Sequence, residues 1–180
     1  MKITETSLPG VLLLTPRIFR DNRGAFQETW NLLAMGEAGL PTAWVQDNFS
    51  VSKKNVLRGV HYQITQPQGK LVRVAYGEAY DVAVDLRRGS PNFGRHVAVE
   101  LTAENGEMLW IPEGFGHAFL ALADVGFAYK VTDYYSPADE RTILWSDPDL
   151  AIPWPVRAGA VIVSDKDNKG VSFREAEVFA

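Results

Sequence analysis

The sequence predicts an all-β fold, built as a sandwich or a barrel. Short runs rich in Val, Ile, Leu, Phe and Tyr recur along the chain, with turn-forming residues between them. The 15 glycines and 10 prolines lie mostly between these runs, where tight β connections need them. The 180 residues are 46% hydrophobic, which suffices for one well-formed core. We therefore expect a single domain over residues 1–180.

Each expected strand is a run of this kind, bounded by turn residues. In chain order the runs span residues 11–15, 43–52, 55–63, 70–77, 79–86, 96–101, 107–112, 117–123, 127–135 and 142–145. The segments "PQG", "RRGSPNFG", "PEGFG" and "SPADE" connect several of them and have the composition of turns. One helix is expected in the first half, within residues 29–41, where Gly39 and Pro41 end it.

Charge and composition exclude several classes of partner. Lysine and arginine number 18 against 22 acids, a formal net charge of -4, so the overall field favours neither nucleic acid nor an anionic membrane. The chain has no cysteine, which excludes disulfides and thiolate metal sites. The N-terminal "MKITETSLPG" lacks the apolar core of a signal peptide, and no apolar run has the length of a membrane span. We expect a cytoplasmic protein.

Alternation in "AWVQDNFSVS" places Gln46, Asn48, Ser50 and Ser52 on one face of a strand. A polar face of this kind is typical of the solvent side of a half-exposed antiparallel sheet. The alternative is a barrel interior lined for a polar ligand, and this would require polar groups on neighbouring strands.

Titratable residues do occur within neighbouring apolar runs. The chain has three histidines. His61 lies within "NVLRGVHYQ" and His117 follows the turn-rich "PEGFG". Lys70 begins one strand and Tyr129 interrupts another. Each of them alone is more typical of an ordinary structural residue, but together they offer a base, an acid and a fixed cation.

The segment "GEMLWIPEGFGHAF" resembles the second conserved motif of the cupins through Gly106, Pro112, Gly114 and His117. This resemblance implies a cupin-like double-stranded β-helix, or jelly roll, with a few short helices. Metal-binding cupins carry two histidines and a glutamate in a first motif. The corresponding stretch here reads "HYQ", and no acid lies between Gln63 and Gly77. We therefore expect no metal.

A closer resemblance covers most of the chain. The segments "FRDNRGAFQETW", "QDNFSVSKKNVLRGVHYQ", "PQGKLVRV", "GEAYDVAVDLR", "SPNFG", "LWIPEGFGHAF", "YKVTDYYSP", "WSDPDLAIPWP" and "VSDKD" are similar, in order, to those of the dTDP-4-dehydrorhamnose 3,5-epimerase family. This resemblance implies an isomerase of dTDP-L-rhamnose biosynthesis that acts on a dTDP-4-keto-6-deoxyhexose, needs no cofactor and forms a homodimer, with an early strand crossing to the partner.

The implied reaction inverts C3 and C5 of the sugar, which flank the C4 carbonyl. Each inversion removes an α-proton to form an enolate and returns a proton to the opposite face. By the resemblance, His61 is the base and Asp167 its paired carboxylate. Lys70 stabilises the C4 oxyanion and also binds substrate. Tyr129 is the proton donor.

The resemblance also implies the binding residues. Arg23 and Arg58 hold the diphosphate, because guanidinium matches phosphate oxygens. Phe26 and Tyr135 are candidates to stack on thymine, with ordinary core packing as the alternative. The remaining substrate-binding candidates are Glu28, Gln46, Asn48 and His117.

One geometric tension accompanies these assignments. On an ideal strand Arg58 and His61 point to opposite faces, so Gly59 is expected to mark a bulge or bend if both side chains line the pocket.

Two other functions stay open at this point. A single-site epimerase that inverts only C3 or only C5, as in deoxysugar pathways, would share the motifs. A non-catalytic sugar-nucleotide-binding cupin is the second alternative, although a binding module would not need a base, a partner acid, a cation and a donor together.

Overall fold

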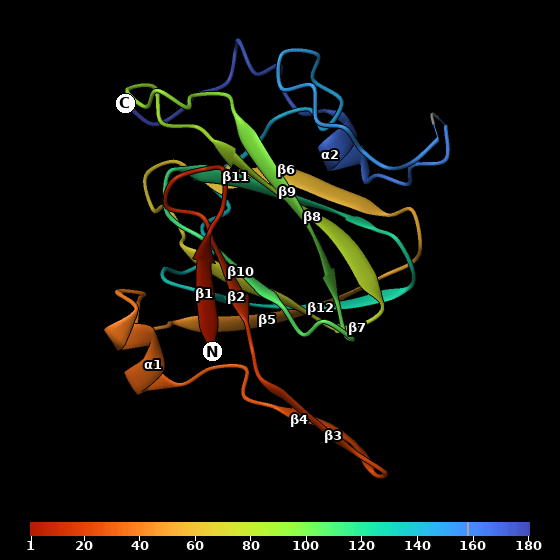
Figure 1. Ribbon diagram of the computed structural model, residues 1–180. Helices are drawn as coiled ribbons and strands as arrows, with labels where there is room; N and C mark the ends of the chain where they lie inside the picture. Colours follow the sequence, from red (N-terminus) through yellow and green to blue (C-terminus); the bar gives the residue numbers. More distant parts are fainter. Residues whose placement is uncertain (158) are drawn as a thin grey trace.

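Strands dominate the computed structural model, which describes residues 1–157 and 159–180 (Figure 1). The strands are β1 (Lys2–Glu5), β2 (Leu12–Thr15), β3 (Ile18–Asp21), β4 (Gly24–Gln27), β5 (Gln46–Ser52), β6 (Leu57–Gln63), β7 (Lys70–Tyr76), β8 (Glu78–Asp85), β9 (His96–Thr102), β10 (Met108–Ile111), β11 (Phe115–Ala121), β12 (Val125–Val131) and β13 (Glu140–Thr142). The helices are α1 (Leu32–Glu37) and α2 (Asp165–Asn168). Within the described residues, neither helix has the length and apolarity needed to cross a membrane.

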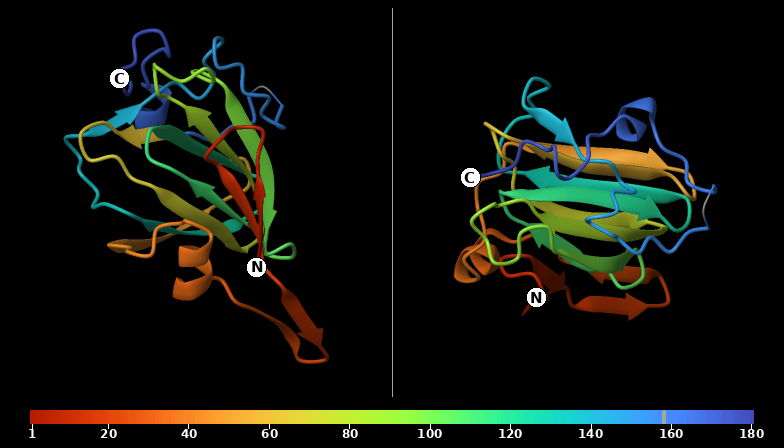
Figure 2. Two further views of the ribbon diagram at one scale, coloured as in Figure 1. Left: turned by 60° about the vertical axis from the view of Figure 1, so that its left-hand side comes forward. Right: turned by 90° about the horizontal axis from the view of Figure 1, so that it is seen from above.

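Two antiparallel sheets face each other and form the body of the molecule (Figures 1 and 2). One has six strands in the order β1-β2-β10-β7-β12-β5, and the other has five in the order β13-β6-β11-β8-β9. Non-consecutive strands lie side by side in both sheets. This arrangement confirms the predicted all-β, cupin-like jelly roll.

The core between the sheets follows from strand alternation. In β12, Phe127 faces inward and is fully buried, and in β11, Phe115 and Phe119 do the same. Phe119 and Phe127 stack across the interior with their ring centroids 4.2 Å apart. These aromatic and aliphatic side chains fill much of the interior, and polar inward residues lie among them, as His117 does between Phe115 and Phe119 on β11.

Further layers cover the outer faces of both sheets. The outward residues of the five-stranded sheet, among them Val82 and Ala118, pack beneath C-terminal residues such as Ile152 and Ala176. The segment around α1 covers part of the six-stranded sheet and buries Met35. The C-terminal layer matters for function because it carries α2 against β6.

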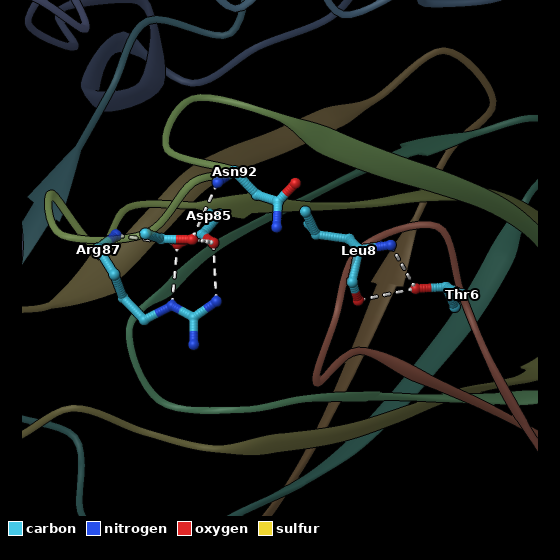
Figure 3. Close-up of polar contacts among 6 residues, drawn as sticks. Thr6, Leu8, Asp85, Arg87 and Asn92 are labelled. Carbon is cyan, nitrogen blue, oxygen red and sulfur yellow. Dashed lines mark hydrogen bonds and ion pairs between the residues drawn. The ribbon is translucent and has the colours of Figure 1, made fainter.

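The loop between β8 and β9 is organised around a buried carboxylate. Asp85 accepts hydrogen bonds from Nε of Arg87 at 2.9 Å and from Nη2 at 2.7 Å (Figure 3). The hydroxyl of Ser90 donates a third hydrogen bond. Burial by itself would raise the pKa of Asp85, but these hydrogen bonds outweigh it and the pKa lies below its usual value.

The elements match the sequence predictions at their centres and differ at their ends. The predicted helix is confirmed as α1, and Gly39 after it has φ +72, the left-handed conformation that favours glycine at a helix end. The strand predicted over 142–145 ends early. Strand β13 ends at Thr142, Ile143 still pairs with Val60 and forms an isolated bridge with Val171, and the chain turns at residues 145–146.

Several elements were not predicted from the sequence. These are β1, the hairpin of β3 and β4, and α2. The hairpin projects away from the two facing sheets (Figures 1 and 2). Its strands contain Gly24 and charged residues, so they lack the continuous apolar run that identified the other strands.

Candidate active site

His61 points into the interior and Arg58 lies at its edge, and one strand supplies both because β6 contains a bulge. His61 pairs with His117 of β11, and Arg58 pairs with Phe119, so three steps on β6 oppose two on β11. Gly59 has φ +116, and a Cβ there would lie 2.5 Å from Cβ of Ala118. The expected irregularity at Gly59 is therefore confirmed, and only glycine fits the position.

The imidazole of His61 is paired with a buried carboxylate. Its Nε2 lies 2.5 Å from Oδ1 of Asp167, which is 3% exposed. Burial by itself raises the pKa of Asp167, but hydrogen bonding and charge from His61, with help from Ser164 and the backbone of Gly59, bring it below its usual value. An ionised Asp167 orients the ring and favours its charged form.

Helix α2 positions Asp167. The hydroxyl of Ser164 accepts a hydrogen bond from the backbone N–H of Asp167 and caps the helix. The helix contacts β6, the strand that carries His61. The pair thus joins two segments that are 106 residues apart in sequence.

The opposite wall of the interior carries the cation and the phenol. Lys70 lies on β7 and Tyr129 on β12, both in the six-stranded sheet, with their side chains on the inward face. Burial lowers the pKa of Lys70 to about 8, although the charges of Glu140 and Asp81 partly oppose this. Burial also raises the pKa of Tyr129, with Arg58 acting in the opposite direction. The hydroxyl is therefore protonated at neutral pH and can act as a donor.

The polar face of β5 also points inward. Gln46, Asn48, Ser50 and Ser52 are partly or fully buried, whereas Asp47, Phe49 and Val51 between them are exposed. The side-chain amide of Gln46 donates to Oδ1 of Asn48 at 2.7 Å. Of the two alternatives for this strand, the interior one agrees with the structure.

Arg58 is held at the edge of the interior by β5. Its Nε donates to Oγ of the buried Ser52 at 3.0 Å, and its Nη2 lies 3.4 Å from the backbone oxygen of Val51. These contacts fix the guanidinium plane and leave other N–H groups available for an anion.

Tyr135 belongs to a group that the sequence analysis did not assemble. Its hydroxyl donates to Oε2 of Glu140 at 2.7 Å, and Nζ of Lys166 lies 2.5 Å from the same oxygen. Burial alone would raise the pKa of Glu140, but these hydrogen bonds, and to a lesser degree the charge of His61, lower it. Glu140 therefore links the loop of Tyr135 to α2.

Three residues near the site were missed from the sequence: Asp81, Glu140 and Lys166. Glu140 lies in "SPADE", which was read as a turn, and Lys166 lies beside Asp167 in "SDKD". Asp81 had a usable signal. It shares a strand face with Ala79 and Ala83, so alternation alone places a carboxylate in the core.

Three expected binding residues lie elsewhere in the single chain. Arg23 and Phe26 are on the projecting hairpin, where Arg23 pairs with Asp21 at 2.7 Å and Phe26 is 70% exposed. Glu28 is exposed beyond the end of β4 and accepts a hydrogen bond from Asn31. The structure does not bring these three side chains to the interior that holds His61.

No group of three His, Asp, Glu or Cys side chains arranged to hold a metal occurs among residues 1–157 and 159–180. The chemistry that this interior can perform is proton transfer. It has an imidazole with a carboxylate on one wall, and an ammonium and a phenol on the facing wall.

Comparison with known proteins agrees with this arrangement. Residues 5–175 match the profile of the dTDP-4-dehydrorhamnose 3,5-epimerase family. The chain is 51% identical over 181 residues to dTDP-4-dehydrorhamnose 3,5-epimerase of Pseudomonas aeruginosa, covering 99% of both proteins.

Solved structures are also similar. The epimerase RmlC from Legionella pneumophila, in complex with dTDP-4-keto-L-rhamnose, superposes with a TM-score of 0.94 at 46% identity, covering 98% of this chain and 94% of that one. ChmJ, a 3'-monoepimerase from Streptomyces bikiniensis, superposes with a TM-score of 0.88 at 34% identity, covering 94% of this chain and 86% of that one. On the profile, the identity and the fold, the chain belongs to the dTDP-4-dehydrorhamnose 3,5-epimerase family.

Proposed function

We propose that this chain inverts C3 and C5 of dTDP-4-keto-6-deoxyglucose through enolate intermediates, as an isomerase of dTDP-L-rhamnose biosynthesis. One observation carries the proposal. The paired base His61 and the donor Tyr129 belong to sheets that face each other. A sugar ring held between the sheets has the base on one face and the donor on the other, which is the arrangement that inversion requires.

The reaction begins with transfer of an α-proton from carbon to Nδ1 of His61, the ring nitrogen that does not face Asp167, and Asp167 stabilises the imidazolium that results. The electron pair of the C–H bond moves to the C4 oxygen. The ammonium of Lys70 stabilises that oxyanion in an interior that contains little water. Tyr129 then gives its proton to carbon from the opposite face, and the C4 carbonyl is restored.

Binding is assigned to the polar groups around this centre. Arg58 holds the diphosphate, with its guanidinium oriented by Ser52. Gln46, Asn48 and His117 contact the sugar or the nucleoside. Tyr135 stacks on the thymine base; it is 52% exposed, which is more consistent with a ligand contact than with core packing.

A homodimer would place the hairpin residues in a site. The outer face of β5, β7 and β12 exposes Phe49 (59%), Val51 (57%) and Tyr76 (44%), an apolar group that an isolated domain would leave in water. A hollow of about 420 Å³ lies mostly on this same face. We propose that two copies pack through it, and that Arg23, Phe26 and Glu28 complete the partner's site. Light scattering at micromolar concentration tests this, and a monomer would contradict it.

The test of the reaction is deuterium exchange. The protein is incubated with dTDP-4-keto-6-deoxyglucose in deuterated water, and the exchanged positions are read by NMR. Exchange and inversion at both C3 and C5 are expected. Exchange at only one centre would identify a single-site epimerase, and tight binding without exchange would identify a binding module.

The single-site alternative retains one supporting observation. ChmJ, a 3'-monoepimerase, has the same fold at 34% identity. The identity to proteins named as 3,5-epimerases is higher, at 51% and 46%, which favours double epimerisation here.

A further inference from the structure

Asp81 is a buried carboxylate that the mechanism above does not use. It is completely inaccessible to solvent, and its Oδ2 lies 2.8 Å from Nε2 of His117. Within residues 1–157 and 159–180, its other oxygen, Oδ1, is buried without any hydrogen-bond partner. A half-satisfied carboxylate at such depth is unfavourable for stability and therefore requires an explanation.

The strand register places Asp81 beside the reactive groups. In β8, Asp81 pairs with Phe119 of β11, and in β11, His117 pairs with His61 of β6. Asp81 and His117 thus form a second carboxylate–imidazole pair on the same wall as His61 and Asp167. In the proposed reaction the His61–Asp167 pair accepts the proton from carbon. With one base serving the reaction, the His117–Asp81 pair has a different role.

The charge of Asp81 acts on the facing wall. Lys70 lies on the inward face of the six-stranded sheet and is partly buried, and Glu140 and Asp81 are the two carboxylates whose charges favour its protonated form. Without such partners, burial would favour the neutral amine. A neutral amine carries no charge with which to stabilise an oxyanion.

We propose that Asp81 is a positioning residue for enolate stabilisation, acting through Lys70 and His117. It keeps Lys70 cationic across the interior, and it fixes the orientation of the His117 ring. As a carboxylate Asp81 has only acceptors, so the proton of His117 must be on Nε2 and the other nitrogen, Nδ1, is the one left for the ligand. This inference rests on the proposed epimerase function.

Several other ionisable groups share this interior and have to be separated from Asp81. Glu140 of β13 favours the charged form of Lys70. The remaining groups on the inward faces of the neighbouring strands are Arg58 and His61 of β6, His117 of β11 and Tyr129 of β12. Glu140 of β13 and Asp167 of α2 are the other carboxylates here, and both have a lowered pKa. Of these two, only Glu140 favours the charged form of Lys70, so it is the group whose effect most resembles that of Asp81.

The first measurement is the ionisation of Lys70 in the substrate-free protein, by NMR of lysines labelled with ¹³C at Cε. The Lys70→Met spectrum assigns the signal. In the wild-type protein the pKa of Lys70 is expected at about 8. Asp81→Asn keeps the shape and an acceptor for His117 but removes the charge, and should lower this pKa by roughly half a unit or more.

The second measurement is the pH profile of epimerisation. If the cation at Lys70 is required, activity falls as pH rises through its pKa. In Asp81→Asn this alkaline fall should move to lower pH by the same amount as the NMR titration. Deuterium exchange and epimerisation should decrease together, by about threefold above pH 8 for a displacement of half a unit, because both pass through the same enolate.

Asp85→Asn is the matched control. Asp85 is equally buried, lies four residues along the same strand and is paired with Arg87 instead of a site residue. Its loss should lower stability and leave both the Lys70 titration and the alkaline fall in place. Asp81→Glu retains the charge and should keep the titration near the wild-type value. Asp81→Ser replaces Asp81→Asn if the latter does not fold.

The outcomes are distinct. An unchanged Lys70 titration in a folded, uncharged Asp81 variant overturns the proposal, whatever happens to the rate. An equal shift of the Lys70 pKa in Asp85→Asn also overturns the proposal, because the shift would then follow from the loss of any buried carboxylate in β8. A wild-type protein that does not epimerise the sugar refutes the proposed function, while the lysine titration still decides the role of Asp81.

Discussion

The charge of Lys70 is predicted to destabilise the folded protein, although the proposed reaction requires it. The substitution Lys70→Met tests this prediction. The difference between the usual lysine pKa of 10.5 and about 8 in the folded protein corresponds to about 3 kcal/mol favouring the neutral amine. Since the side chain is only partly buried, water screens part of this amount. We expect Lys70→Met to raise the free energy of unfolding by between about 1 and 3 kcal/mol at pH 7 while abolishing epimerisation.

The sign of the pH dependence follows from proton binding. Between about pH 8 and pH 10.5 the unfolded chain holds a proton on Lys70 that the folded chain has lost. Wild-type stability from this group therefore rises with pH across that window. The advantage of Lys70→Met should be complete below about pH 8 and should disappear by about pH 10.5.

Urea unfolding at several pH values measures this, with Lys54→Met as control. Lys54 is exposed, so the same chemical change there should alter stability by less than about 0.5 kcal/mol. In thermal scans, the Lys70 variant should melt about 3 to 10 °C higher. A Lys70→Met protein that is equally or less stable at pH 7, or whose advantage does not change with pH, would refute the reasoning.

Four further substitutions test proton transfer and binding. His61→Asn should abolish both deuterium exchange and epimerisation while the fold stays intact, and retention of more than a small fraction of exchange would exclude His61 as the base. Asp167→Asn should reduce activity less than His61→Asn does, because the imidazole remains. Tyr129→Phe should still exchange substrate hydrogen for deuterium while forming little inverted sugar, so the ratio of exchange to epimerisation rises; a proportional loss of both in a folded variant would rule out the donor role. Ser52→Ala should raise KM with little change in kcat, since it removes the acceptor that orients Arg58; titration calorimetry with dTDP should show weaker binding by about 1 kcal/mol, and unchanged affinity would contradict the orienting role.

Local pattern determined how much of the fold was predictable. The strands that read as apolar runs, such as "KLVRVAYG" and "HVAVEL", were found because half-buried strands select branched and aromatic residues. The hairpin of β3 and β4 was not predicted, since Phe19 and Phe26 are 51% and 70% exposed in the single chain and burial therefore imposes no apolar pattern on these strands. Helix α2, at four residues, is too short to have a period.

The site was predictable to the extent that resemblance supplied residue roles. His61, Asp167, Lys70 and Tyr129 meet in one interior, although only the structure shows which wall carries each. Pairing between β6 and α2 depends on tertiary packing, so no local pattern could place Asp167 beside His61. Asp81 is the exception. Its position in an alternating apolar strand was visible in the sequence, but its contact with His117 and its effect on Lys70 were not.

The bulge at Gly59 fixes the distance between Arg58 and His61, and so limits the length of substrate that can contact both. Because Arg58 and His61 oppose residues only two apart on β11, their backbones are separated by about 7 Å along the strand instead of about 10 Å. In the function proposed above, Arg58 anchors the diphosphate and His61 meets a carbon of the sugar, so this spacing would select which carbon is presented. A substrate with a longer or shorter link between phosphate and ring would bind with the wrong atom at the imidazole.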